Sequence, residues 1–317
     1  MSLIEKAAQR LDKLKQASGE LPAELPAQSP VVHVPAADKP AAEHAAVRSS
    51  EVPKAATGQS FSRVVSRVAQ IDLARLHSLG LVTPDHPRGT IAEEYRVIKR
   101  PLLRNATATG AAKIDDGNLI MVTSALPGEG KTFNAVNLAI SMAMELDYTV
   151  LLVDADVSRP SVLRQLGLPP EKGLMDVLAG DVTDLSEVLM RTNIEKLSIL
   201  PAGMPHQRAT ELLASDAMTR LLEQMASRYP DRIIVFDSPP LLVTTESRVL
   251  ATHMGQIVMV VEAERTTHAT VKQALATIES CPIKLMVLNK SRGQGADSIY
   301  GYGYGYGYGD APREQAA

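Results

Sequence analysis

The residues of this chain that could do chemistry begin with a glycine-rich stretch, VTSALPGEGKTF, at residues 122–133. Its core reads as a phosphate-binding (Walker A) loop with alanine in place of the first glycine. Such a loop turns backbone N–H groups toward phosphates at a helix N-terminus, while a lysine reaches the phosphate oxygens and a hydroxyl binds Mg²⁺. Gly128, Gly130, Lys131 and Thr132 supply these groups. We therefore predict an ATP and Mg²⁺ site; a glycine-rich turn that merely caps a helix is the alternative.

Three aspartates follow apolar segments downstream of the loop. LLVDADVSRP places Asp154 and Asp156 two residues apart, and IIVFDSPP supplies Asp237. A lone acid at a strand end often only caps the next helix, but three acids facing one phosphate loop indicate phosphoryl transfer. That reaction needs carboxylates for Mg²⁺ and one to take the proton of the nucleophile. We assign Asp237 to the Mg²⁺ shell, Asp154 to the base and Asp156 to the metal side, with the order of the last two left open.

A third feature, YGYGYGYGYGD, runs from residue 300 to residue 310 and holds five of the eight tyrosines. Glycine offers no side chain to pack and is costly to order, so this stretch does not read as a buried strand. We expect a flexible tail that presents phenol hydroxyls to solvent, at Tyr300, Tyr302, Tyr304, Tyr306 and Tyr308.

The elements that must position these groups follow from apolar patterns along the chain. Strands are expected at 118–124, 149–156, 197–203, 232–240, 256–263 and 283–290. Helices are expected at 71–82, 90–103, 131–146, 161–167, 216–228, 246–254 and 269–280. This alternation predicts an α/β fold of the P-loop NTPase type, with a mostly parallel sheet and helices on both faces. Right-handed crossovers would bring the carboxyl ends of the strands, with their polar residues, to one edge.

Composition sets the class of protein. The chain has 317 residues, 45% of them hydrophobic, and a net charge of −3, which fits a globular protein and disfavours a nucleic-acid partner. The N-terminal stretch is charged from its fifth residue, and no run reaches the ~18 apolar residues of a membrane helix, so we expect a protein without a signal peptide or membrane span. A single cysteine, Cys281, fits a reducing cytosol.

The same patterns divide the chain into three parts. Residues 1–60 hold a short amphipathic helix and then an Ala/Pro-rich stretch, which predicts a disordered linker. Residues 61–299 are expected to form the catalytic domain, and residues 300–317 the tyrosine-rich tail.

The motifs PGEGKT, LLVDAD…RP and IIVFDSPP, in this order and followed by a tyrosine cluster, resemble those of the bacterial tyrosine kinases. These are Walker-motif enzymes that autophosphorylate a C-terminal tyrosine cluster. The segment EEYRVIKRPLL and the N-terminal helix resemble the exosortase-associated branch, which is tied to exopolysaccharide production. The resemblance covers roughly residue 91 to the end of the chain.

The resemblance implies ATP and Mg²⁺ as cofactors, with Thr132, Asp156 and Asp237 on the metal. It extends the nucleotide site over the whole loop, Pro127, Gly128, Glu129, Gly130, Lys131, Thr132 and Phe133. Asn289, at the end of the last strand, is a candidate for a contact to the nucleobase, although an asparagine there often only closes a turn. The tail tyrosines would be the phosphoacceptors.

The resemblance also implies partners. A membrane polysaccharide co-polymerase would activate the kinase and recruit it from the cytoplasm to the inner face of the membrane, and a tyrosine phosphatase would reverse the reaction. Self-association as a ring-like homo-oligomer would use a Glu-x-x-Arg-x-x-Arg motif, which here reads Glu93, Arg96 and Lys99.

Two other functions compete with this interpretation. A partitioning ATPase of the MinD/ParA kind shares the expected sheet, but such proteins carry a second lysine early in the loop, where this chain has Leu126. A non-catalytic adaptor with an adhesive Tyr/Gly tail would not need Lys131, Asp154 and Asp237. Neither alternative uses both the acids and the tyrosines.

Overall fold

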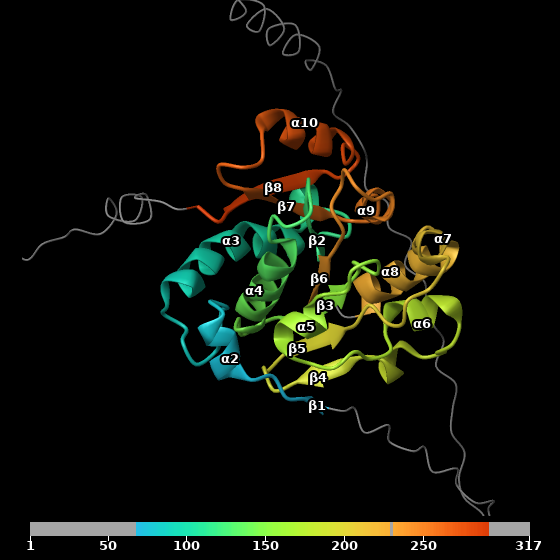
Figure 1. The fold of residues 1–317 in the computed structure, drawn as a ribbon, viewed down its shortest axis with the longest axis horizontal. Coiled ribbons are helices and arrows are strands. Elements are labelled where there is room, and N and C mark those ends of the chain that lie inside the picture. The colour runs from blue at the N-terminus through green and yellow to red at the C-terminus, as the bar shows by residue number, and fades with distance from the viewer. Residues whose placement is uncertain (1–67, 229–230, 292–317) are drawn as a thin grey trace, which may run out of the picture. The chain divides into compact units, whose positions relative to one another are not determined.

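The computed structural model describes residues 68–228 and 231–291 (Figure 1). The expected N-terminal helix and linker, and the five tail tyrosines, lie outside the described residues. The centre of the described part is an eight-stranded sheet with the strand order β1-β4-β5-β3-β6-β2-β7-β8. Neighbouring strands run parallel, except that β4 is antiparallel to β5. The expected mostly parallel α/β sheet is confirmed.

The strands are β1 (Val68–Ala69), β2 (Leu119–Ser124), β3 (Thr149–Asp154), β4 (Met190–Thr192), β5 (Leu197–Leu200), β6 (Arg232–Asp237), β7 (Gln256–Glu262) and β8 (Ile283–Asn289). The α-helices are α2 (Leu73–Ser78), α3 (Thr90–Ala106), α4 (Lys131–Ala143), α5 (Val162–Leu166), α6 (Leu174–Ala179), α7 (Ala209–Leu213), α8 (Asp216–Arg228), α9 (Glu246–Ala251) and α10 (His268–Ala276), with 3₁₀ turns at Gly110–Ala112 and Leu185–Glu187. No helix of the described ranges is long and apolar enough to cross a bilayer.

Alternate residues of the central strands enter two separate cores. In β2, Leu119 and Met121 pack with the helices α6 to α10, whereas Ile120 and Val122 pack with α2 to α5. All four side chains are buried, so the strand reads as a continuous apolar run, as expected when helices cover both faces of a parallel sheet.

The same alternation decides where two of the acids point. Asp154 and Asp237 are paired across the β3/β6 ladder, at the carboxyl ends of both strands. Leu152 and Val235, two residues before them, belong to the core on the α4 side. Because side chains in a strand repeat every second residue, both aspartates lie on the face covered by α4. The sheet therefore presents them to the helix that follows the phosphate-binding loop.

Helix α3 packs on α4 through one buried charge. Lys99 is 4% exposed, and its ammonium donates to the backbone carbonyl of Ser141 at 2.5 Å and pairs with Glu145 at 2.8 Å. Burial holds the pKa of Lys99 below its ordinary value, although Glu145 opposes that shift. Glu93 and Arg96 are exposed and pair with each other. Lys99 is thus buried between α3 and the end of α4, unlike Glu93 and Arg96, and the expected part of these three residues in self-association stays a prediction.

We predict that Lys99→Met lowers the free energy of unfolding by about 1–3 kcal/mol, because the Ser141 carbonyl and the Glu145 carboxylate lose their buried donor. Methionine retains the apolar stem, so little packing is lost. Urea unfolding followed by circular dichroism measures the change. The matched control, Arg96→Met, removes an exposed charge from the same helix and should stay within about 0.5 kcal/mol of the parent. Equal destabilisation by both changes would contradict this role of Lys99.

Candidate functional site

The predicted phosphate-binding loop connects β2 to the first residue of α4, Lys131. Gly128 and Gly130 adopt φ values of +86° and +98°, a left-handed region that favours glycine. A Cβ atom on Gly130 would also collide with the Asn289 side chain. The loop therefore ends at a helix N-terminus, where free N–H groups and the helix dipole attract anions. This geometry suits phosphate.

Glu129 shapes the loop from inside. Glu129 is only 2% exposed. Its carboxylate accepts hydrogen bonds from the Leu126 N–H at 2.6 Å and from the Thr266 hydroxyl. The carboxylate is therefore engaged within the protein, where it fixes the loop, and the expected contact of Glu129 to the nucleotide stays a prediction.

The last strand holds the same loop from a second side. The amide nitrogen of Asn289 donates to the backbone carbonyl of Glu129 at 2.8 Å, and the ammonium of Lys290 donates to that of Gly128 at 2.7 Å. Lys290 also pairs with Glu262 at 3.1 Å. The Asn289 side chain is thus engaged with the loop, and its expected contact to the nucleobase stays a prediction.

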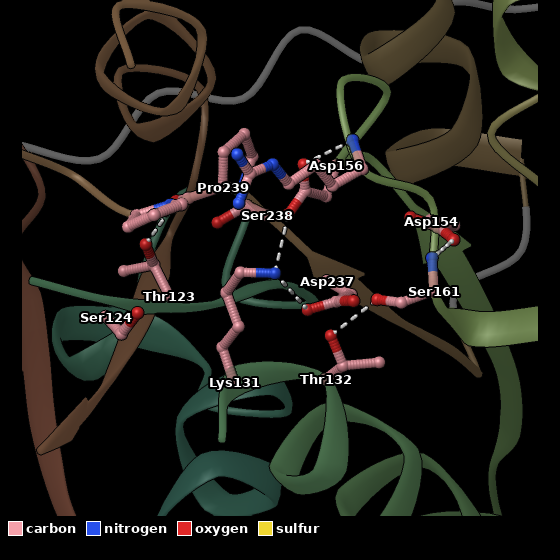
Figure 2. A network of polar contacts seen from close by, with 12 residues as sticks. Thr123, Ser124, Lys131, Thr132, Asp154, Asp156, Ser161, Asp237, Ser238 and Pro239 are labelled. Atoms are coloured by element: carbon pink, nitrogen blue, oxygen red, sulfur yellow. Dashed lines mark hydrogen bonds and ion pairs between the residues drawn. The ribbon is translucent and has the colours of Figure 1, made fainter. Parts of the chain in front are cut away.

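Lys131 lies between two of the predicted acids (Figure 2). Its ammonium is 2.6 Å from Asp156 and 3.9 Å from Asp237. Burial alone would lower the pKa of Lys131, but the carboxylates of Asp237 and Asp156 outweigh it and raise the pKa above its ordinary value. Lys131 therefore keeps its positive charge at the N-terminus of α4.

Asp154 and Asp237 are buried carboxylates with unsatisfied oxygens. Oδ2 of Asp154 accepts from the N–H groups of Ser161 and Val162, each at 3.0 Å, while its Oδ1 has no hydrogen-bond partner in the described structure. Both carboxylate oxygens of Asp237 likewise lack one. Burial raises the pKa of Asp154 to about 6 and that of Asp237 to about 7, the latter against the opposing charge of Lys131. Buried polar atoms without partners are rare in proteins.

These orphaned oxygens fit Mg²⁺ bound together with a nucleotide. Among the residues that the structure describes, no group of three or more His, Cys, Asp or Glu side chains forms a metal cage. Mg²⁺ commonly uses one or two carboxylates and completes its shell with phosphate oxygens and water. Asp237 offers free oxygens, and the Thr132 hydroxyl lies beside it, 2.9 Å from that of Ser161. The residues present therefore suit the ion.

A cavity of about 410 Å³ opens in front of Lys131. It brings together the loop residues Pro127, Gly128 and Lys131 with Asp156. Its other lining residues are Ser158, Arg159, Ser161, Arg164, Pro239, Pro240, Val243 and Thr244. The Phe133 side chain packs against the core on the α4 side, and its expected place in the nucleotide site stays a prediction.

Ser161 and Arg164 also line the site, although their sequence positions did not identify them. The Ser161 N–H donates to Asp154, and the Ser161 hydroxyl shares a hydrogen bond with that of Thr132. Ser161 therefore links the carboxyl end of β3 to the residues that follow the loop. A signal was available in Arg159-Pro160-Ser161, three to five residues after Asp156, because a segment that follows a strand end at the carboxyl edge lies near the other groups of that edge.

Comparison with known proteins agrees with this geometry. A model of the AAA domain family matches residues 117–290. The tyrosine-protein kinase YwqD of Bacillus subtilis strain 168 is 29% identical over 207 residues, which are 65% of this chain and 83% of YwqD. The succinoglycan biosynthesis transport protein ExoP of Rhizobium meliloti strain 1021 is 32% identical over 225 residues, 69% of this chain but 27% of ExoP. The chain thus spans most of some relatives and about a quarter of others.

Among solved structures, the kinase domain of VpsO superposes with a TM-score of 0.51 at 30% identity. The match covers 62% of this chain and 99% of that domain.

We predict that Glu129→Ala weakens ATP binding at least tenfold, because a charged hydrogen bond contributes about 1.5–3 kcal/mol and 1.4 kcal/mol is a factor of ten. The loop would lose the hydrogen bonds that the Glu129 carboxylate accepts from Leu126 and Thr266. Isothermal titration calorimetry with ATP and Mg²⁺ measures the affinity. Glu279→Ala, which removes an exposed glutamate elsewhere, is the matched control and should leave the affinity unchanged. Identical ATP affinities in the two variants would contradict the role of Glu129 in fixing the shape of the loop.

Proposed function

Because the chain belongs to the AAA domain family and, within it, to the bacterial tyrosine kinases, we propose that it transfers the γ-phosphoryl group of ATP to tyrosine hydroxyls. The observation that carries this proposal is the unpartnered Oδ1 of Asp154, buried beside the phosphate-binding loop. A general base must present a free oxygen to the proton that it takes. A nucleotide switch that only hydrolyses ATP gives no reason for the tyrosine tail.

Three groups of this chain would divide the work. The N–H groups at the start of α4 hold the phosphates, and Lys131, poised between Asp156 and Asp237, meets the oxygens that gain charge during transfer. Mg²⁺, when bound near Thr132, Asp156 and Asp237, neutralises further phosphate charge. Asp154 orients the attacking hydroxyl and accepts its proton.

Two bonds change at the γ-phosphorus, and one proton is transferred. The phenol oxygen of the acceptor bonds to the γ-phosphorus while the bond from that phosphorus to the β–γ bridging oxygen breaks, and the electron pair leaves with ADP. The phenol proton passes to Asp154. Asp154 and Asp237 are paired across the adjacent strands β3 and β6, so the proposed base and the proposed metal ligand lie side by side.

We propose the tail tyrosines as acceptors, used in trans between copies of the chain. The tyrosines of the folded part offer poor substitutes. Tyr95 is 4% exposed and its hydroxyl donates to Asn134 at 2.8 Å, while burial raises its pKa above the ordinary value. Tyr148 is half-buried, and Tyr229 lies outside the described residues. The Tyr/Gly sequence, which lies outside the described residues, holds five further tyrosines, and we propose these as the acceptors.

The biological setting proposed is exopolysaccharide synthesis and export. ExoP, of which this chain matches part, is named for succinoglycan biosynthesis and transport. We propose a cytoplasmic kinase that a membrane polysaccharide co-polymerase recruits to the inner face of the membrane and activates. Ring-like self-association would use the exposed pair Glu93 and Arg96, and a tyrosine phosphatase would reset the tail.

Lys131→Met should reduce phosphotyrosine formation by a hundredfold or more, because the lysine charge acts on the transferring group in the transition state. The measurement is phosphotyrosine mapping by mass spectrometry after incubation with Mg-ATP, with circular dichroism to check the fold. Lys272→Met, an exposed change on α10, is the matched control. If the parent protein hydrolysed ATP but formed no phosphotyrosine, the MinD/ParA-like switch would replace the kinase.

The tail is tested by changing Tyr300, Tyr302, Tyr304, Tyr306 and Tyr308 together to phenylalanine. Nearly all autophosphorylation should disappear, whereas a single change should be mild because four acceptors remain. ATP affinity should survive, since the phosphate-binding loop lies elsewhere in the sequence. Nucleotide titration runs in parallel with the mapping. Phosphotyrosine retained at Tyr148 or Tyr229 in the fivefold variant would exclude the tail as the main acceptor.

A further inference from the structure

Ser161 contacts two parts of the site that come from different elements (Figure 2). It directly precedes α5, and its backbone N–H donates to Oδ2 of Asp154 at 3.0 Å. Its hydroxyl lies 2.9 Å from the hydroxyl of Thr132, the second residue of α4. One residue therefore connects the acid at the end of β3 with the hydroxyl that follows the phosphate-binding loop.

The backbone, and not the side chain, sets the position of Ser161. The N–H of Val162 donates to the same oxygen of Asp154, also at 3.0 Å, so two consecutive N–H groups hold this turn against a buried carboxylate. Pro160 precedes Ser161 and restricts the turn further, because its ring fixes φ. None of these contacts uses the Ser161 hydroxyl, so the local fold does not depend on it.

The Thr132 hydroxyl, by contrast, needs a partner if it is to bind a cation. A hydroxyl carries one proton and two lone pairs. A cation takes a lone pair, so the proton must point elsewhere. Asp237 lies beside Thr132 but is proposed to bind the same ion. A Thr132 proton directed at Asp237 would turn the Thr132 lone pairs away from the ion that the two residues share. The Ser161 oxygen, on the other side of Thr132, offers the proton a place.

We propose that Ser161 is a positioning residue for the metal site: its hydroxyl oxygen accepts the Thr132 proton and so turns a Thr132 lone pair toward Mg²⁺. The inference rests on the nucleotide and Mg²⁺ site of the proposed kinase function and deepens it. Partners of this kind, one step beyond the ligands, orient the ligands of a metal and tune its affinity. The backbone bond from Ser161 to Asp154 makes the same short turn responsible for the proposed base.

A purely structural bond between the two hydroxyls is the competing role. Such a bond would tie α5 to α4 whether or not an ion is present, and its loss would weaken nucleotide binding with and without Mg²⁺. A bond that orients a lone pair matters only when the ion is bound. The dependence on Mg²⁺ therefore separates the two roles.

Three variants of the full-length chain make the test. Ser161→Ala removes the hydroxyl and keeps both backbone contacts, and Ser161→Thr retains a hydroxyl at the same carbon. Ser158→Ala is the matched control, because Ser158 lines the same cavity and is exposed. Calorimetry measures the affinity for the non-transferable analogue β,γ-methylene-ATP, first in EDTA and then in excess Mg²⁺.

In Mg²⁺, Ser161→Ala should bind the analogue about tenfold more weakly than the parent, because the loss of such a partner commonly lowers metal affinity ten- to hundredfold. In EDTA its affinity should stay within twofold of the parent value. Ser161→Thr and Ser158→Ala should match the parent within twofold in both buffers.

Three results would overturn the proposal: parent-like binding by Ser161→Ala in Mg²⁺, an equal loss in both buffers, or a parent whose affinity does not respond to Mg²⁺. The measurement needs no phosphoryl transfer, so it is independent of the kinase proposal. If the Mg²⁺-dependent loss and its rescue by threonine appeared while no sample formed phosphotyrosine from ATP, the role of Ser161 would stand and the kinase function would fall.

Discussion

The whole site depends on one electrostatic imbalance. Three aspartates surround a single lysine, and two of them are buried with oxygens that accept no hydrogen bond from any described group. Isolated buried charge is costly unless it is paired or coordinated. Lys131 relieves part of the excess, and burial raises the carboxylate pKa values as a further response. A cation that binds together with phosphates would compensate the remaining negative charge. The excess of carboxylates therefore favours binding of Mg-nucleotide.

The sheet creates that imbalance through its register. Asp154 and Asp237 are partners across one ladder and occupy positions of equal parity, so they cannot turn to opposite faces. The order of strands then spreads the groups along the edge: residues at the end of β8 hold the loop, the loop follows β2, Asp237 ends β6 and is our proposed metal ligand, and Asp154 ends β3 and is our proposed base. A one-residue slip of β3 would send its acid into the opposite core. Apolar packing of both faces therefore fixes the chemistry as firmly as the polar groups do.

Long aliphatic strands and the loop motif could be predicted from the sequence, because each carries a periodic or spaced signal that tertiary packing only reinforces. The short elements β1, β4, α6 and α7 could not, since two to six residues hold too little periodicity. The acids were identifiable by their position after apolar runs. The burial of Lys99 and Glu129 could not be predicted, because only the fold shows that each charged side chain is enclosed by specific hydrogen bonds.

Hydrogen bonds from two sides of the sheet explain how the phosphate-binding loop keeps its shape. From the α3 side, the Tyr95 hydroxyl donates to Asn134, whose amide nitrogen donates to the carbonyl of Gly130 at 2.9 Å. From the β8 side, Asn289 and Lys290 donate to the carbonyls of Glu129 and Gly128. Carbonyls tied back in this way leave the loop N–H groups to face the phosphates, so little reorganisation remains when nucleotide binds. The same contacts join α3 and the end of β8 to a single loop, so packing on two sides of the sheet bears on the geometry of the phosphate-binding site.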